Sequence, residues 1–230
     1  MEKHIFEIQV DDKKYEVVSI FLEGREYLIK GENSFYIALN EMLKYNTKPL
    51  TIDEIIKLRL KTYSRDFDFN KLTIDTGIFY KKEEENIVLF ELKSKDSYKK
   101  IINNKFNEIQ EEETNRIMNI KINDLLDMIN KQFSKEEALN NIIWRGLVSE
   151  EDLKEYAFLL FDKQKDNRKK MGIGHSEPLE NENGHSEPIE NENIKAGYLT
   201  LLRSFDGTGD ISFNEFPFKK SYSIMIGEII

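Results

Sequence analysis

Cysteine is absent from the 230-residue chain. The absence excludes disulfide bonds, a thiolate nucleophile and any zinc or iron–sulfur site with cysteine ligands. Long apolar runs are also absent, so no segment is expected to span a membrane. The first ten residues lack the apolar run of a signal peptide, and we therefore expect a protein that is not secreted and has no membrane partner.

Basic residues are fewer than acidic ones, 34 against 43, which gives a net charge of −9. This balance disfavours nucleic acid as a partner, because general polyanion binders are usually basic. Much of this excess of negative charge comes from one segment of the chain. Residues 174–183 are repeated almost unchanged at 184–193, and the two copies carry six glutamates and no basic residue. The remainder of the chain is therefore closer to neutral.

Short strand patterns open the chain. Apolar and polar residues alternate over Ile5–Val10, Tyr15–Leu22 and Glu26–Ile29, which predicts a β-meander. A helix is expected over Phe35–Tyr45. Thr51-Ile-Asp-Glu54 has the spacing of a capping box and predicts the start of a second helix.

A β-hairpin is expected from Leu72–Tyr80 and Ile87–Leu92, joined by a charged turn. Further helix-start patterns follow at Ser134 and Ser149. This mixture predicts an α+β fold class, with an N-terminal β-meander, packed helices and a hairpin in one compact domain, residues 1–161.

A change of composition follows this domain. Residues 162–195 contain a basic run and the duplicated acidic segment, whose composition predicts a disordered repeat linker. Residues 196–230 recover apolar content and are interpreted as a short C-terminal docking segment. Such a segment either folds back onto its own domain or adds a strand to a neighbouring molecule. Both alternatives stay open at this stage.

Three charged residues form a candidate catalytic group. Asp75 ends an apolar segment, and Glu91 and Lys93 lie two residues apart on one strand, hence on one face. With the surrounding helices, Thr51–Ile122 resembles the PD-(D/E)xK nuclease superfamily, although Ile74 stands where that motif has proline. The resemblance implies that Asp75 and Glu91 bind Mg²⁺ and that Lys93 positions or activates water. The alternative is ordinary cross-strand charge pairing.

A second candidate site is the segment Ser204–Glu215. Aligned on Gly209, it has the glycine and the final glutamate of an EF-hand calcium loop, with Asp206 as a further ligand. Ser204 and Thr208 replace the acidic residues usual at two other positions. The alternative is a glycine turn between two strands, Leu199–Phe205 and Ile211–Phe213, and we prefer it.

The order of elements in 1–161 resembles the baseplate hub and baseplate-assembly proteins of T-even-type phages. The segments that carry the resemblance are Lys14-Tyr-Glu-Val17, Leu22-Glu-Gly-Arg-Glu26, the helix Phe35–Tyr45, Leu50-Thr-Ile-Asp53 and Leu58-Arg-Leu-Lys-Thr-Tyr-Ser64. It implies a non-enzymatic structural or assembly protein of a phage virion, of tail baseplate type. Such a protein contacts other proteins of a multi-subunit assembly in the host cytoplasm and needs no cofactor.

Two alternatives to this function remain. One is the Mg²⁺-dependent nuclease with Asp75, Glu91 and Lys93 as its site. The other is a small intracellular inhibitor or regulator of a host system, which would also be acidic and would also act through its surface.

Overall fold

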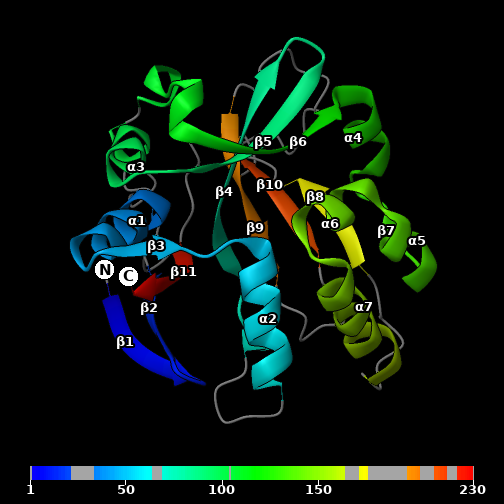
Figure 1. The fold of residues 1–230 in the computed structure, drawn as a ribbon, viewed down its shortest axis with the longest axis horizontal. Helices are drawn as coiled ribbons and strands as arrows, with labels where there is room; N and C mark the ends of the chain where they lie inside the picture. Colours follow the sequence, from blue (N-terminus) through cyan, green and yellow to red (C-terminus); the bar gives the residue numbers. More distant parts are fainter. Residues whose placement is uncertain are drawn as a thin grey trace, which may run out of the picture.

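The computed structural model describes residues 2–21, 34–63, 69–103, 105–163, 171–175, 196–202, 210–216 and 222–229. This part of the chain contains seven α-helices and eleven strands in one mixed sheet, which confirms the α+β class (Figure 1). The strands are β1 (Glu2–Val10), β2 (Lys13–Phe21), β3 (Thr47–Pro49), β4 (Ile74–Glu83), β5 (Asn86–Leu92), β6 (Thr114–Lys121), β7 (Gln132–Phe133), β8 (Met171–His175), β9 (Ala196–Leu201), β10 (Ile211–Glu215) and β11 (Tyr222–Ile229). The helices are α1 (Ser34–Lys44), α2 (Ile52–Thr62), α3 (Lys95–Ile102), α4 (Ile122–Met128), α5 (Lys135–Asn140), α6 (Ile142–Leu147) and α7 (Glu150–Phe158).

Strand β4 is the branching point of the sheet. The main path runs β1-β2-β11-β4-β9-β10-β8-β7, while β5 pairs with β4 and β6, and β3 pairs with β11. The start of β4 meets β11 in parallel at Asp75, and its later part, from Ile78, pairs antiparallel with β5. Strand β9 pairs with β4 as well. The sheet therefore forks where β11 and β5 part from β4.

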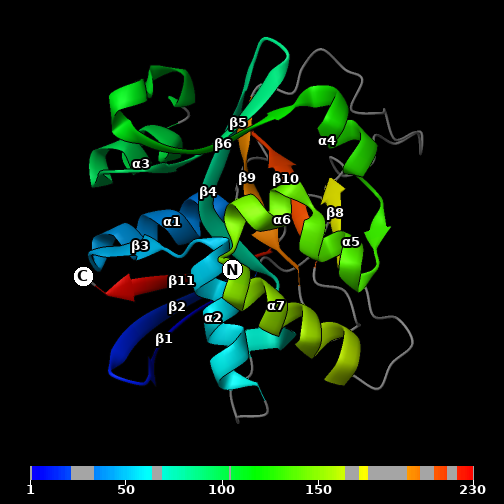
Figure 2. The ribbon, with the colours of Figure 1, turned by 45° about the vertical axis from the view of Figure 1, so that its right-hand side comes forward.

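Helices cover both faces of the sheet, and two core clusters result. Figures 1 and 2 both show α1 and α3 on one side of β4 and α6 and α7 on the other. All six residues of β9 are buried, and Tyr198 and Leu199 enter different clusters. A strand covered on both faces has few polar residues, and in β9 only Thr200 is polar.

Several local expectations are confirmed. The Thr51 amide donates to the Glu54 carboxylate at 2.8 Å, and the Glu54 amide donates to Thr51 Oγ1 at 3.3 Å, so the capping box begins α2. The first two strands and the β4–β5 hairpin also form as expected, whereas the third strand of the expected meander, Glu26–Ile29, lies outside the described residues. No helix among the described residues is long and apolar enough to cross a membrane.

The C-terminal strands belong to the same sheet as the N-terminal ones. Strand β11 lies between β2 and β4, where Met225 is the partner of both Val18 and Asp75. Strands β9 and β10 continue the sheet beyond β4. Composition led us to treat 196–230 as a separate docking segment. Its described strands instead complete the core of their own chain, because their apolar side chains fill both clusters.

The segment expected to be a linker is in part a strand. Met171–His175 forms β8, and Met171 and Ile173 are buried in the core. The remainder of the duplication, 176–193, lies outside the described residues, as do residues 164–170 and 194–195 of the expected linker. So do residues 204–209 of the candidate calcium loop, but its flanks are the antiparallel pair β9–β10, as the glycine-turn interpretation predicts.

Removal of residues 196–230 tests the dependence of the fold on these strands. We expect the truncated chain to lose its cooperative thermal unfolding transition, because β4 loses two neighbours and both clusters lose buried side chains. Circular dichroism and calorimetry measure this. Deletion of 184–193, which removes no residue of β8 or β9, is the control and should leave the melting temperature nearly unchanged. A truncated chain that still unfolds cooperatively would contradict the assignment.

Gly197 offers a point test of the same packing. A Cβ atom there would lie 1.9 Å from the Asn214 carbonyl oxygen and 2.6 Å from the Tyr80 ring. We expect Gly197→Ala to lower the free energy of unfolding by about 3 kcal/mol. Gly174→Ala is the matched control, since its Cβ would meet nothing closer than 4.0 Å, and a change within about 0.5 kcal/mol is expected. Urea denaturation of both variants provides the comparison, and equal losses would show the packing argument to be wrong.

Candidate functional site

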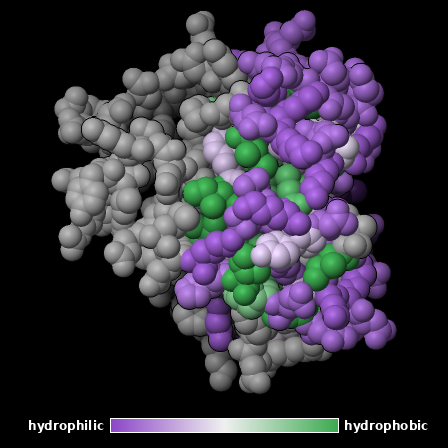
Figure 3. All heavy atoms as spheres, turned by 90° about the vertical axis from the view of Figure 1, so that its left-hand side faces the viewer, coloured by the Kyte–Doolittle hydropathy of each residue, from purple (hydrophilic) through white to green (hydrophobic). Residues whose placement is uncertain are grey.

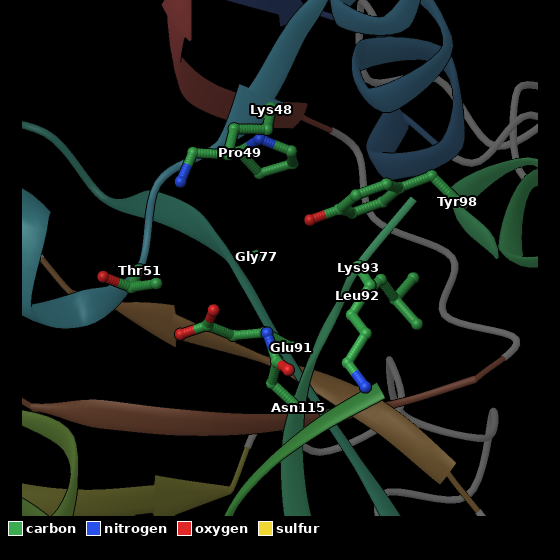
Figure 4. A pocket seen from close by; sticks show the side chains of 9 residues that line it. All are labelled: Lys48, Pro49, Thr51, Gly77, Glu91, Leu92, Lys93, Tyr98 and Asn115. Carbon is green, nitrogen blue, oxygen red and sulfur yellow. The ribbon is translucent and has the colours of Figure 1, made fainter. Parts of the chain in front are cut away.

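A pocket lies at the fork of the sheet, between β3 and the end of β5 (Figure 4). Its volume is about 210 Å³. We call it the fork pocket, and its lining residues are Lys48, Pro49, Thr51, Gly77, Glu91, Leu92, Lys93, Tyr98 and Asn115. Gly77 allows the chain after β3 to approach β4. Its amide donates to the Leu50 carbonyl at 2.8 Å, and a Cβ atom there would lie 2.8 Å from the Pro49 oxygen.

Glu91 contributes a half-buried carboxylate to the fork pocket. In Figure 4 this carboxylate points toward Thr51. Burial raises its pKa, the negative charge of Glu54 raises it further, and Lys48 opposes both. Within the described part of the chain, Glu91 makes no side-chain hydrogen bond and no ion pair. Among the described residues, this carboxylate therefore has no ion-pair partner, and the charge of Lys48 compensates it only in part.

The two lysines of the pocket are directed elsewhere. Lys48 Nζ lies 3.8 Å from a carboxylate oxygen of Glu54. Lys93 Nζ donates to the Glu112 carbonyl at 3.0 Å, and in Figure 4 it points away from the Glu91 carboxylate. Neither ammonium group forms an ion pair with Glu91, and only the charge of Lys48 acts on it from a distance.

Tyr98 and Asn115 supply neutral polar groups. Tyr98, from α3, is buried, and its hydroxyl points into the pocket in Figure 4. Burial raises the pKa of Tyr98 well above its usual range, and the charges of Glu91 and Glu54 add to the effect, so the phenol stays protonated. Asn115, on β6, is the register partner of Glu91. These groups can orient a ligand by hydrogen bonds.

Asp75 is separated from the other two predicted catalytic residues. It is fully buried on β4 and does not line the fork pocket. Its carboxylate accepts a hydrogen bond from Thr200 Oγ1 at 2.7 Å and another from the Ser223 hydroxyl. Glu91 and Lys93 do line the same pocket, but the Asp75 carboxylate is hydrogen-bonded inside the sheet. Among the described residues, no group of three or more histidines, aspartates or glutamates is placed to hold a metal ion.

Sequence reasoning missed most of this arrangement. Thr200 and Ser223 are 125 and 148 residues from Asp75, so no local pattern connects them. Tyr98 and Asn115 reach the pocket only through the packing of α3 and the pairing of β6 with β5. Thr51 was recognised as a helix cap, and that signal locates one wall of the pocket.

No protein-family model matches the chain, and no curated protein matches it. A solved structure does. The chain is similar to a protein from Nanoarchaeota that is described as accommodating massive sequence variation by the C-type lectin fold. The match has a TM-score of 0.54 and 12% sequence identity, and it covers 96% of this chain and 100% of that one. At this identity the likeness concerns the fold.

This comparison corrects the two resemblances drawn from the sequence. The resemblance to T-even-type baseplate hub and assembly proteins is wrong, and so is the partial resemblance of residues 51–122 to PD-(D/E)xK nucleases. The chain instead shares its overall arrangement with a C-type lectin fold. A short order of strands and helices was misleading because it left out the C-terminal strands, which decide the topology.

The carboxylate of Glu91 predicts a pH-dependent stability difference. Since its pKa is raised by folding, the wild type loses stability as pH rises through that pKa, and Glu91→Gln removes the loss. We expect the variant to be at least as stable as the wild type at neutral pH, with the difference vanishing in acid. Urea denaturation at about pH 3 and about pH 7 measures it.

Glu41→Gln is the control of opposite sign. Hydrogen bonds from Lys3 and Lys44 lower the pKa of Glu41, so its contribution to stability is present at neutral pH and is lost as pH falls. This variant should have a lower free energy of unfolding than the wild type at neutral pH, and the difference should disappear in acid. Parallel pH profiles for the two variants would contradict the environment described for Glu91.

Proposed function

We propose that the protein is a non-enzymatic binding module that recognises a protein partner through the fork pocket. The observation that carries the proposal is the half-buried Glu91 carboxylate, which forms no ion pair or hydrogen bond with a described side chain and which faces an open pocket. Tyr98 and Asn115 beside it offer hydrogen bonds. The assembly and regulatory roles expected from the sequence both act through contacts of this kind.

The surface supports polar rather than apolar recognition. Figure 3 shows one face on which hydrophilic side chains predominate among the described residues, with several small hydrophobic groups between them. The exposed large apolar side chains come from separate elements: Phe6, Tyr45, Ile142, Phe158 and Ile229. Single exposed apolar residues are normal on protein surfaces, whereas docking faces are contiguous.

The fold neighbour gives a second line of support. That protein is described as accommodating massive sequence variation. In this chain the charged residues of the pocket are half-buried or exposed, whereas buried charged groups such as Asp75 lie outside the pocket. We propose the same separation here, in which a fixed sheet carries a binding surface whose side chains are free to vary.

A randomised peptide-display library selected on the immobilised full chain tests the proposal. Asn115→Trp fills the pocket from an exposed position on β6. We expect this variant to bind the selected peptides with an affinity lower by about tenfold or more. Asn119→Trp is the matched control, because this residue is exposed on the same strand and does not line the pocket. Dissociation constants come from calorimetry.

The control variant should bind the selected peptides as the wild type does. Peptides that bind wild type and Asn115→Trp equally would overturn the pocket as the recognition site, and a selection that enriches no peptide would overturn the proposed function.

A further inference from the structure

We infer that the fork pocket receives a basic side chain, lysine or arginine, of the protein partner, and that Glu91 is its counter-ion. The inference rests on the proposed function and specifies the chemistry of the partner. It follows from the charges, the hydrogen-bonding groups and the size of the pocket.

The charges around the pocket compensate the Glu91 carboxylate only in part, through the charge of Lys48. Lys48 is 3.8 Å from Glu54, and Lys93 donates to the Glu112 carbonyl, so both cations on the rim are engaged. Glu54 lies close enough to disfavour the charged form of Glu91. A cation entering the pocket relieves this repulsion and replaces the water that Glu91 has lost. Half-buried charges interact more strongly than exposed ones, because water screens them less.

The hydrogen-bonding groups of the pocket suit a ligand that donates hydrogen bonds. Ammonium and guanidinium groups only donate, and they need several acceptors around them. The Glu91 carboxylate, the Tyr98 hydroxyl oxygen and the Asn115 amide oxygen line the same pocket and all can accept. In Figure 4 the Tyr98 hydroxyl and the Glu91 carboxylate both face the space beside Gly77.

Size points to a single side chain. The volume of about 210 Å³ is below the range of about 300–1,000 Å³ that is usual for sites enclosing a whole small molecule. It suffices for the end of one lysine or arginine that projects from a surface.

Titration of the ¹⁵N-labelled full chain with Nα-acetyl-lysine methylamide and its arginine analogue tests the inference. We expect saturable shifts of the Gly77, Glu91 and Asn115 amide signals, with a dissociation constant on the order of millimolar, as for one isolated contact. Glu91→Gln should weaken binding by about tenfold. Binding should also weaken as pH falls, because protonation removes the charge of Glu91.

Three controls make the result decisive. The Nε-acetylated lysine derivative has nearly the same shape but no charge, and it should not shift these signals. Glu151→Gln alters an exposed glutamate on α7, away from the pocket, and should leave the affinity unchanged. Asn119→Trp, on the same strand as Asn115 but outside the pocket, should likewise leave the affinity unchanged.

Equal shifts by the charged and acetylated probes, or equal affinity of wild type and Glu91→Gln, would overturn the inference. The display selection separates this failure from failure of the proposed function. Peptides that require the pocket but contain no lysine or arginine would leave the binding module intact and remove only the basic side chain as its ligand.

Discussion

The buried carboxylate of Asp75 is the constraint on which the arrangement of the sheet depends. A buried carboxylate without hydrogen bonds is strongly destabilising. The Thr200 and Ser223 hydroxyls both donate to it, and Thr200 in turn accepts from Asn214 at 2.8 Å. These residues lie on β9, β11 and β10. These hydrogen-bonded polar side chains therefore lie on four neighbouring strands, β11, β4, β9 and β10. The Asp75 carboxylate obtains its hydrogen bonds only when strands from the end of the chain pair with β4.

A buried arginine adds a second connection of the same kind. The Arg59 guanidinium on α2 donates to the Tyr156 hydroxyl at 2.6 Å and to the carbonyls of Leu72 and Leu202 at 2.8 Å each. It thus ties α2 to α7 and to the chain leaving β9. Together with Gly77, which brings the start of α2 close to β4, these contacts fix the frame of the fork pocket. The lining side chains are then available for binding.

Local patterns predicted the elements well where the interactions that form them are local. The capping box of Thr51 and Glu54 needs only residues three apart, and the β4–β5 hairpin needs only neighbouring strands and a turn. Glu91 and Lys93 were expected together, and they do line one pocket. Asp75 was expected with them, but a pattern around residue 75 contains no information about hydroxyls at 200 and 223.

The sequence by itself determined the α+β class, most N-terminal elements and the presence of Glu91 and Lys93 on one strand, because short-range periodicity and capping decide these. Only the tertiary structure decided that the C-terminal strands enter the central sheet, that Asp75 is structural and that Glu91 faces a pocket with no ion-pair partner among the described residues. The physical reason is pairing over long sequence separation. Strands β2, β4 and β11 satisfy one another's backbone groups and bury one another's side chains, and no single segment encodes that match.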